Sequence, residues 1–265
     1  MKLPLSTTSK ENSIFYEVSS ENFVWTQDPK EVSPMVISVC HNGMHKNDFT
    51  GLFNTRKNGS KLDDLYVWPL VKGISWKFPA HIVRGLIPRY FVDYNRHTTK
   101  YFFNPDTDLL KDTEFACEDD RLAPFHEYFH QSVCDRVNES KSVWGRQALF
   151  IDFHGYRNQP PYGEYDVILG TANTKTVLEN EDHRLSEFLR QKGYKVFLPM
   201  KETVSDGTPD TFDAGFTTRN VFSKTGVTSI QIEVHASIRT DSQKAIKFSR
   251  EFRELLNDFY PTLKK

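Results

Sequence analysis

Three cysteines, Cys40, Cys117 and Cys134, are all that the 265-residue sequence contains, and an odd number leaves at least one thiol unpaired. The sequence also lacks a run of about 20 apolar residues, the length needed to cross a bilayer. Its first residues, MKLPLSTTSKENS, contain no apolar signal core. These absences predict a soluble protein of a reducing compartment, the cytoplasm, with no membrane partner.

Charge of one sign is not in excess either. The 34 Lys and Arg residues nearly balance the 35 Asp and Glu residues, which gives a formal net charge of -1. A general nucleic-acid binder carries a basic patch, so this balance argues against nucleic acid as a partner. The sequence contains no Pro/Gly/Ser-rich linker, low-complexity run or internal repeat, and we therefore expect residues 1–265 to form a single domain.

The stretch ALFIDFHGYR, residues 148–157, combines an apolar run with two polar side chains. Such a run is typical of a strand that is buried on both faces of a parallel sheet. Because side chains alternate along a strand, Asp152 and His154 point to the same side. Ligands of open α/β sheets bind at the carboxyl ends of strands, so both residues are candidates for metal chemistry. In the alternative interpretation, His154 only forms a hydrogen bond with the next loop.

A second β-branched run, MVISVC at residues 35–40, is also followed by a histidine and a glycine, His41 and Gly43. One histidine from each of two neighbouring strands can bind the same ion, which makes a zinc site a hypothesis at this point. His45 and Cys40 are rival ligands. Alternation along the strand directs Cys40 away from His41, and we expect its thiol to lie in the core.

Strands alternate with helices in the second half of the chain. YDVILGT and YKVFLP are typical of buried strands, and EDHRLSEFLRQKG is an amphipathic helix closed by Gly193. A further helix is predicted over residues 241–260, where apolar residues recur at spacings of three and four. This order of elements predicts an α/β sheet with helices on both faces.

An acidic residue stands in the predicted strand SIQIEVHA, residues 229–236. Alternation places Ile230, Ile232 and Val234 on one face of this strand and Glu233 on the other. Buried carboxylates are rare without a partner, and their raised pKa suits a general base. Glu233 is therefore a candidate for proton transfer, with a structural salt bridge as the alternative.

Two polar segments in the first half of the chain are further candidates. The adjacent carboxylates Asp63 and Asp64 provide either a metal ligand or the N-cap of a helix. PRYFVDYNRH places Arg89, Asp93, Asn95 and Arg96 around a short aromatic strand. The planar fork of arginine suits carboxylate recognition, although surface ion pairing is the usual alternative.

The predicted helix over residues 122–137 contains His126-Glu127-Tyr128-Phe129-His130, which matches the HExxH pattern. In that pattern two histidines on one helix face bind zinc and the glutamate serves as the base. No third ligand follows at the spacing of HExxHxxGxxH. The alternative interpretation is that the two histidines border the apolar stripe of the helix at the edge of the core.

Eight segments in the same order resemble the N-formylglutamate amidohydrolase family. They are ISVCHNG, LDDLYVWPL, PRYFVDYNRH, YFHQSV, WGRQALFIDFHG, DVILGT, FDAGFTTR and SIQIEV. The resemblance extends over residues 34–240 and implies a single-domain α/β fold similar to zinc carboxypeptidases, with a central mixed, mostly parallel sheet flanked by helices on both faces. It also implies a hydrolase that cleaves the amide of a small-molecule acylated amino acid or short peptide.

The resemblance implies roles for individual residues of this chain. The proposed zinc ligands, for one ion per chain, are His41, Asp64 and His154. Asp63 remains the alternative carboxylate, because the alignment across the preceding polar loop can slip by one residue. The groups that act on the substrate are the base Glu233, the oxyanion donor Arg89, and the carboxylate-binding residues Asn95, Arg96 and Arg219. The chain departs from the family where Asn42 replaces a serine and Ala214 replaces the first residue of a glycine pair.

The implied mechanism begins with zinc, which lowers the pKa of a bound water towards ~7. Glu233 accepts its proton, the hydroxide attacks the amide carbonyl, and Glu233 then protonates the leaving amine. Asp152 is a candidate to orient a ligand histidine. Two rival hypotheses are a peptidase that uses HEYFH with Glu127 as the base, and a catalytically silent relative that binds a small acid or a protein. Because the four matched ligand and base positions are retained, the sequence favours an enzyme.

Overall fold

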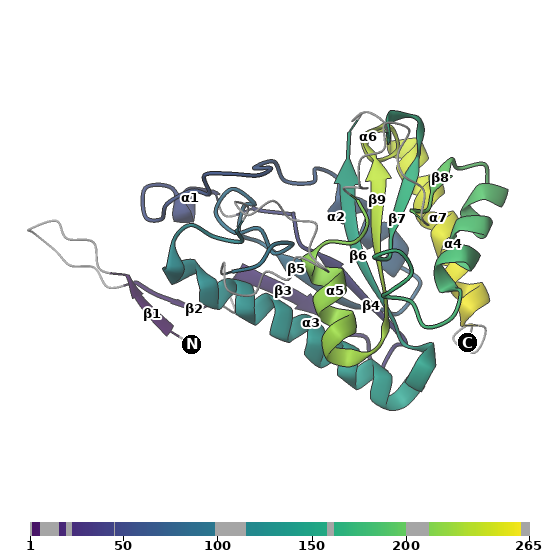
Figure 1. Ribbon diagram of the computed structural model, residues 1–265, viewed down its shortest axis with the longest axis horizontal. Coiled ribbons are helices and arrows are strands. Elements are labelled where there is room, and N and C mark those ends of the chain that lie inside the picture. The colour runs from purple at the N-terminus through teal and green to yellow at the C-terminus, as the bar shows by residue number, and fades with distance from the viewer. Residues whose placement is uncertain are drawn as a thin grey trace, which may run out of the picture.

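The computed structural model describes residues 2–5, 16–19, 23–44, 46–98, 115–157, 162–199 and 212–260. Within these ranges a seven-stranded mixed sheet has the order β3-β5-β4-β6-β9-β7-β8 (Figure 1). In that order, its strands are Val24–Gln27, His81–Gly85, Met35–Val39, Leu149–Tyr156, Thr228–His235, Val167–Gly170 and Val196–Phe197. A separate two-stranded sheet pairs β1 (Lys2–Leu5) with β2 (Tyr16–Ser19).

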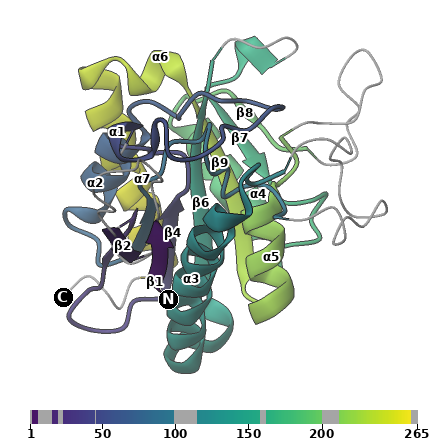
Figure 2. The same ribbon diagram turned by 90° about the vertical axis from the view of Figure 1, so that its left-hand side faces the viewer.

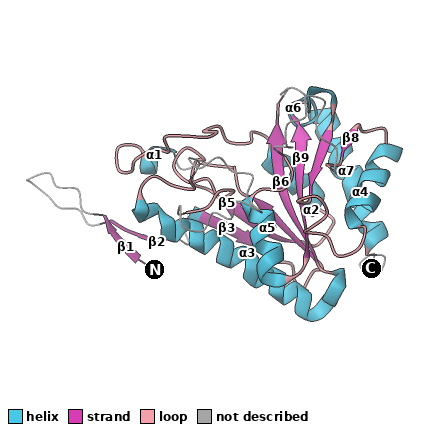
Figure 3. Cartoon of the chain, viewed as in Figure 1, coloured by secondary structure: helices cyan, strands magenta, loops and turns pink. Residues whose placement is uncertain are grey.

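Most strands of the central sheet are parallel. β4 pairs in parallel with both β5 and β6, and β6 pairs in parallel with β9, whereas β3 and β7 are antiparallel to their neighbours β5 and β9. The predicted α/β fold with a mixed, mostly parallel sheet is therefore confirmed (Figure 3). Because β4, β6 and β9 point the same way, their carboxyl ends lie at one edge of the sheet, where ligand sites form in such folds.

Helices cover both faces of the sheet (Figure 2). α2 (Val67–Ser75), α4 (Glu181–Gln191) and α7 (Ser242–Phe259) contribute to the core on one face, and α3 (Ala123–Trp144) and α5 (Phe216–Thr225) to the core on the other. The short elements are α1 (Lys46–Phe49), α6 (Ala236–Arg239) and the 3₁₀ turns Asp120–Leu122, Gly145–Gln147 and Tyr162–Glu164. None of the described helices is long and apolar enough to span a bilayer.

Alternating side chains divide the core into these two layers. Ile230, Ile232 and Val234 of β9 all belong to the layer beneath α2, α4 and α7, as their spacing predicts. On the same strand, Gln231 and Glu233 point to the opposite face. The opposite layer includes the apolar stripe of α3, which the sequence also predicts.

Three local predictions are wrong. The loose alternation of residues 14–25 predicts an edge hairpin, but the described strands of this segment pair elsewhere, β2 with β1 and β3 with β5. PRYFVDYNRH forms turns instead of a strand, since the Phe91 and Val92 amides both donate to the Pro88 carbonyl. Its buried aromatic residues fill the core from a loop. The segment FDAGFTTRN predicts a loop or short strand at Arg219, but Arg219 lies in the helix α5, which begins directly after Gly215.

Phe252→Ala should lower the free energy of unfolding by about 3–5 kcal/mol, the usual cost of emptying a buried aromatic site. Phe252 is fully buried, and its ring centroid lies 5.3 Å from that of Phe153. Ile246, exposed on the same helix, is the matched control, and Ile246→Ala should change stability by less than about 0.5 kcal/mol. Urea unfolding followed by circular dichroism measures both. Equal effects of the two substitutions would contradict the assignment of this core.

Candidate active site

Three strands deliver the candidate site at the carboxyl edge of the sheet. His41 follows β4 by two residues, and His154 lies near the end of β6. Glu233 of β9 is the direct register partner of His154. All three side chains are buried. The parallel arrangement of β4, β6 and β9 therefore brings together residues that are far apart in the sequence.

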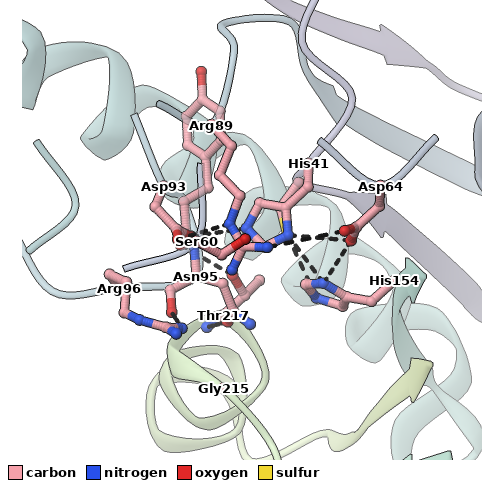
Figure 4. A network of polar contacts seen from close by, with 12 residues as sticks. His41, Ser60, Asp64, Arg89, Asp93, Asn95, Arg96, His154, Gly215 and Thr217 are labelled. Atoms are coloured by element: carbon pink, nitrogen blue, oxygen red, sulfur yellow. Dashed lines mark hydrogen bonds and ion pairs between the residues drawn. The ribbon is translucent and has the colours of Figure 1, made fainter. Parts of the chain in front are cut away.

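Both histidines face one carboxylate oxygen (Figure 4). Asp64 Oδ2 lies 3.2 Å from His41 Nδ1 and 3.3 Å from His154 Nδ1. The same oxygen accepts a hydrogen bond from the Gly155 amide at 3.2 Å. Two nitrogens and one oxygen, from three separate segments, thus converge on one point.

The opposite nitrogen of each imidazole contacts a second buried carboxylate. His41 Nε2 lies 2.7 Å from Asp93 Oδ1, and His154 Nε2 lies 2.7 Å from Asp152 Oδ2. Asp152 also accepts a hydrogen bond from Ser38. A carboxylate behind an imidazole fixes the orientation of the ring and its tautomer, which is the usual environment of a metal-binding histidine. The structure places Asp152 where the sequence predicts an orienting residue.

The spacing between Asp64 and each histidine suits a tetrahedral metal ion. Donors at about 2.0–2.1 Å from tetrahedral zinc lie about 3.3 Å from one another. The distances from Asp64 Oδ2 to the two Nδ1 atoms, 3.2 and 3.3 Å, match this spacing. His41, Asp64 and His154 therefore have suitable donor chemistry, and the two separations that involve Asp64 suit such an ion.

Asp63 and Asp64 have different surroundings. Asp63 Oδ1 accepts hydrogen bonds from the Gly43 and Arg89 amides, both at 3.1 Å, and so joins two loops. A side chain at Gly43 would obstruct this contact, because its Cβ would lie 2.2 Å from Pro88 Cα. Neither carboxylate is the N-cap of α2, whose capping position is Tyr66. Of the two, Asp64 is the one that faces the histidines.

Cys40 is a buried core residue, as predicted, and it also lies beside His154. Its Sγ is 3.5 Å from His154 Nε2 and 3.8 Å from Nδ1. Within the described ranges, Cys40, His41 and His154 form a group whose potential ligand atoms lie within 4.8 Å of one another. The thiol is nearer to the nitrogen that contacts Asp152 than to the one that faces Asp64, which makes it a rival ligand on the other side of the ring.

The buried carboxylates make this site favourable for positive charge. Burial opposes protonation of His41 and His154, but nearby carboxylates outweigh it and raise the pKa of each imidazole well above its ordinary value. Burial likewise opposes ionisation of Asp64, yet the two histidines hold its pKa well below the usual range. The site therefore stabilises positive charge, and a divalent metal would benefit in the same way as the protonated imidazoles.

Glu233 lies at the margin of this cluster. Its Oε1 is 4.0 Å from His154 Nδ1 and accepts a hydrogen bond from Gln231 Nε2 at 3.0 Å. Burial raises the pKa of Glu233 to about 7, although His154 opposes the shift. A carboxyl group in such surroundings can take up and release a proton near neutral pH.

Arg89 and His154 lie on opposite sides of His41 (Figure 4). Arg89 Nε donates to Asp93 Oδ2 at 2.9 Å, and its Nη1 lies 3.9 Å from Asp64 Oδ1. Only 12% of its side chain is exposed. Asp93 is fully buried, and its two carboxylate oxygens contact Arg89 and His41 and so join them. This places a guanidinium group next to the candidate metal ligands.

The predicted carboxylate-binding residues lie around the start of α5. The Asn95 side chain accepts a hydrogen bond from the Thr217 amide at 2.9 Å. Arg96 Nη1 donates to the Asn95 carbonyl at 2.9 Å. Arg219 Nε donates to the carbonyl of Ala214, a non-glycine residue with φ 64°, at 2.8 Å. The structure thus brings Asn95 and Arg96 to the first turn of the helix that carries Arg219.

The HEYFH histidines have a different environment. His126 and His130 are buried, and their Nε2 atoms lie 2.9 Å from the carbonyls of Arg96 and Tyr94. Burial lowers the pKa of His126 to about 4, so its imidazole is neutral at physiological pH. Glu127 is exposed. The two histidines support the backbone of the loop around Asn95, and no carboxylate of the motif faces them.

The sequence does not reveal the supporting roles of Asp93 and Arg56. Asp93 stands within PRYFVDYNRH, but its contact with His41 depends on a turn that the aromatic pattern concealed. Arg56 is buried, lies 3.2 Å from Asp93 Oδ2, and donates to the carbonyls of Phe115 and Ser60 at 2.7 and 2.8 Å. It comes from a polar segment that is typical of an exposed loop. No pattern in the sequence distinguishes it from a surface arginine.

Comparison with known proteins gives one family. The sequence model for N-formylglutamate amidohydrolase matches residues 33–238. The N-formylglutamate amidohydrolase from Ralstonia eutropha JMP134 is 15% identical with a TM-score of 0.64, over 91% of this chain and 98% of that chain. The gene product Atu2144 from Agrobacterium tumefaciens is 15% identical with a TM-score of 0.59, over 91% and 95%. A comparison with curated protein sequences finds no match.

The different surroundings of the two aspartates give a matched test. Asp64→Asn should weaken zinc binding by more than about 100-fold, since loss of even an outer partner of a metal ligand typically costs 10–100-fold. Asp63→Asn should change it by less than about threefold, because the amide oxygen still accepts both backbone hydrogen bonds. Competition with a chromophoric chelator measures both affinities. The reverse order would identify Asp63 as the ligand.

Proposed function

The chain belongs to the N-formylglutamate amidohydrolase family, and from this membership we propose that it is a zinc-dependent amidohydrolase acting on small N-acylated amino acids of the N-formyl-L-glutamate type. One observation carries the proposal. Asp64 Oδ2 faces the Nδ1 atoms of His41 and His154, while both Nε2 atoms contact buried carboxylates. Histidines that face a shared carboxylate and are oriented by further carboxylates support a metal site at this position.

His41, Asp64 and His154 would hold one ion. Two imidazoles and a carboxylate are a ligand set typical of catalytic zinc, which keeps a further position for water or substrate. Bound zinc lowers the pKa of water and polarises a carbonyl group. The chain provides the remaining chemistry through residues around these ligands.

Glu233 is the proposed general base. It lies beside His154 and is not one of the two carboxylates behind the histidines, so it does not serve to orient a ligand ring. As the base, Glu233 takes a proton from the attacking water and delivers it to the nitrogen of the leaving amine. Its buried surroundings and its hydrogen bond from Gln231 hold the carboxyl group in one orientation.

Arginines surround the proposed substrate position. Arg89, held by Asp93, is the proposed donor to the oxygen that becomes negative when the amide carbonyl is attacked. Asn95, Arg96 and Arg219 are proposed to bind the carboxylates of the amino acid. Their position at the start of α5 supports this, because a helix N-terminus also favours anions.

The HEYFH peptidase is a weaker alternative. In a zinc site of that kind the glutamate acts on the same ion as the histidines. Here Glu127 is exposed, whereas the two histidines contact backbone carbonyls. Retention of the ligands and base at the sheet edge also favours an enzyme over a silent binding relative.

A substrate panel tests the proposed function. Zinc-loaded protein should release amine from N-formyl-L-glutamate or a related N-acyl amino acid, and removal of the metal with a chelator should abolish the activity until zinc is restored. His41→Ala should be inactive, and His183→Ala, which alters an exposed histidine on α4, should match the wild type. Amine release is followed with a fluorogenic amine reagent. Zinc-independent turnover would contradict the proposal.

Two glutamine variants distinguish the two candidate bases. Glu233→Gln should retain zinc and lower kcat by a factor of about 10² to 10⁴, the usual range for loss of a general base. Glu127→Gln should leave kcat within about twofold, because an exposed side chain far from the reacting atoms contributes little. Each variant is checked for folding by circular dichroism and for metal content before assay. An inactive Glu127→Gln beside an active Glu233→Gln would assign the chemistry to HEYFH.

A further inference from the structure

A buried arginine lies beside the site without a part in the chemistry described so far. After β9 the chain turns into α6, which Figure 1 shows at the carboxyl ends of β6 and β9. Its last residue, Arg239, is only 6% exposed. Arg239 Nε donates to the Val234 carbonyl at 2.8 Å, Nη2 donates to the Tyr156 carbonyl at 3.0 Å, and Nη1 donates to the Leu65 carbonyl. One guanidinium group therefore binds three backbone segments.

Each of these segments carries a residue of the proposed site. Leu65 directly follows Asp64, and Val234 directly follows Glu233. Tyr156 lies two residues after His154 on β6. Asp64, His154 and Glu233 are thus connected through one rigid, planar group. Lysine cannot replace it, because a single ammonium on a flexible stem lacks the fixed fork of donors.

The contact with β6 is unusually close. A Cβ on Gly155 would lie 2.3 Å from Arg239 Cζ, so the guanidinium group occupies space that only glycine leaves open. The amide of the same glycine donates to Asp64 Oδ2 at 3.2 Å. The glycine against which Arg239 packs is therefore also the one that makes this hydrogen bond to the shared carboxylate.

We propose that Arg239 is a positioning residue that sets the spacing between the metal ligands Asp64 and His154 and the base Glu233. Misplacement of reacting groups by about 1 Å can cost about 10²-fold in rate. A guanidinium group that fixes three segments prevents such a displacement. Hydrogen bonding of the buried carbonyls alone would not require one side chain to bind all three segments. The rate measurement in the test rests on the proposed function, whereas the zinc measurement does not.

The test compares Arg239→Lys and Arg239→Met with Arg253→Met. Arg253 is a half-buried arginine on α7 that donates to the Gly73 carbonyl at 2.8 Å, so it controls for loss of a similar bond away from the site. Both Arg239 variants should bind zinc about 10–100-fold more weakly in chelator competition, the range for loss of a supporting contact. Their kcat should fall by about 10–100-fold with KM within about twofold. Arg253→Met should change neither property.

Gly155→Ala provides a second approach that keeps the charge of Arg239. The new methyl group displaces the guanidinium, so this variant should also lower kcat and zinc affinity. If it acts through Arg239, its effect should be much smaller in the Arg239→Lys background than in the wild type. Additive effects would contradict the coupling.

The outcomes separate the two hypotheses. Zinc affinity and kcat of the Arg239 variants equal to those of Arg253→Met would overturn the positioning role, even in an active enzyme. If the wild type hydrolyses none of the N-acyl amino acids, the proposed function fails, and zinc affinity alone decides the role of Arg239. If Arg239→Met does not fold, Arg239→Lys and Gly155→Ala decide it.

Discussion

One carboxylate oxygen, Asp64 Oδ2, faces two buried imidazoles, and the other features of the site depend on this interaction. Each histidine can face Asp64 only because a further carboxylate fixes its opposite nitrogen. Such a concentration of buried negative charge is costly unless cations balance it. Arg89 and protonated histidines can supply part of that charge, and a divalent ion would supply more. The electrostatics and the donor geometry thus lead to the same proposal.

The sheet makes this arrangement possible. β4 and β9 flank β6 in parallel, so residues at the ends of three strands meet at one edge. The loops then complete the site through hydrogen bonds to backbone groups. Asp63 joins the loops around Gly43 and Arg89. Arg239 joins the segments that follow Asp64, His154 and Glu233. Strand positions are fixed by the core, whereas loop positions depend on these few buried polar groups.

The sequence predicts those parts of the fold and of the candidate site that depend on periodicity. Alternation placed Asp152 and His154 on one side of their strand and Glu233 opposite the apolar face of its own strand, and the stripe of α3 predicted its packing. Periodicity contains no information about contacts with backbone atoms, so it could not choose between Asp63 and Asp64 or reveal Arg56 and Arg239. It also misassigned PRYFVDYNRH, because buried aromatic residues in a turn have the composition of a strand. The family resemblance chose Asp64 where periodicity could not.

The ligand set of bound zinc tests the account most directly. X-ray absorption spectroscopy of zinc-loaded protein should show only nitrogen and oxygen neighbours at about 2.0–2.2 Å, with the scattering of two imidazoles. Asp64→Asn and Cys40→Ser provide the comparison, and only the first should alter the spectrum. A sulfur neighbour at about 2.3 Å that disappears in Cys40→Ser would show that the thiol, and not the Asp64 carboxylate, completes the site.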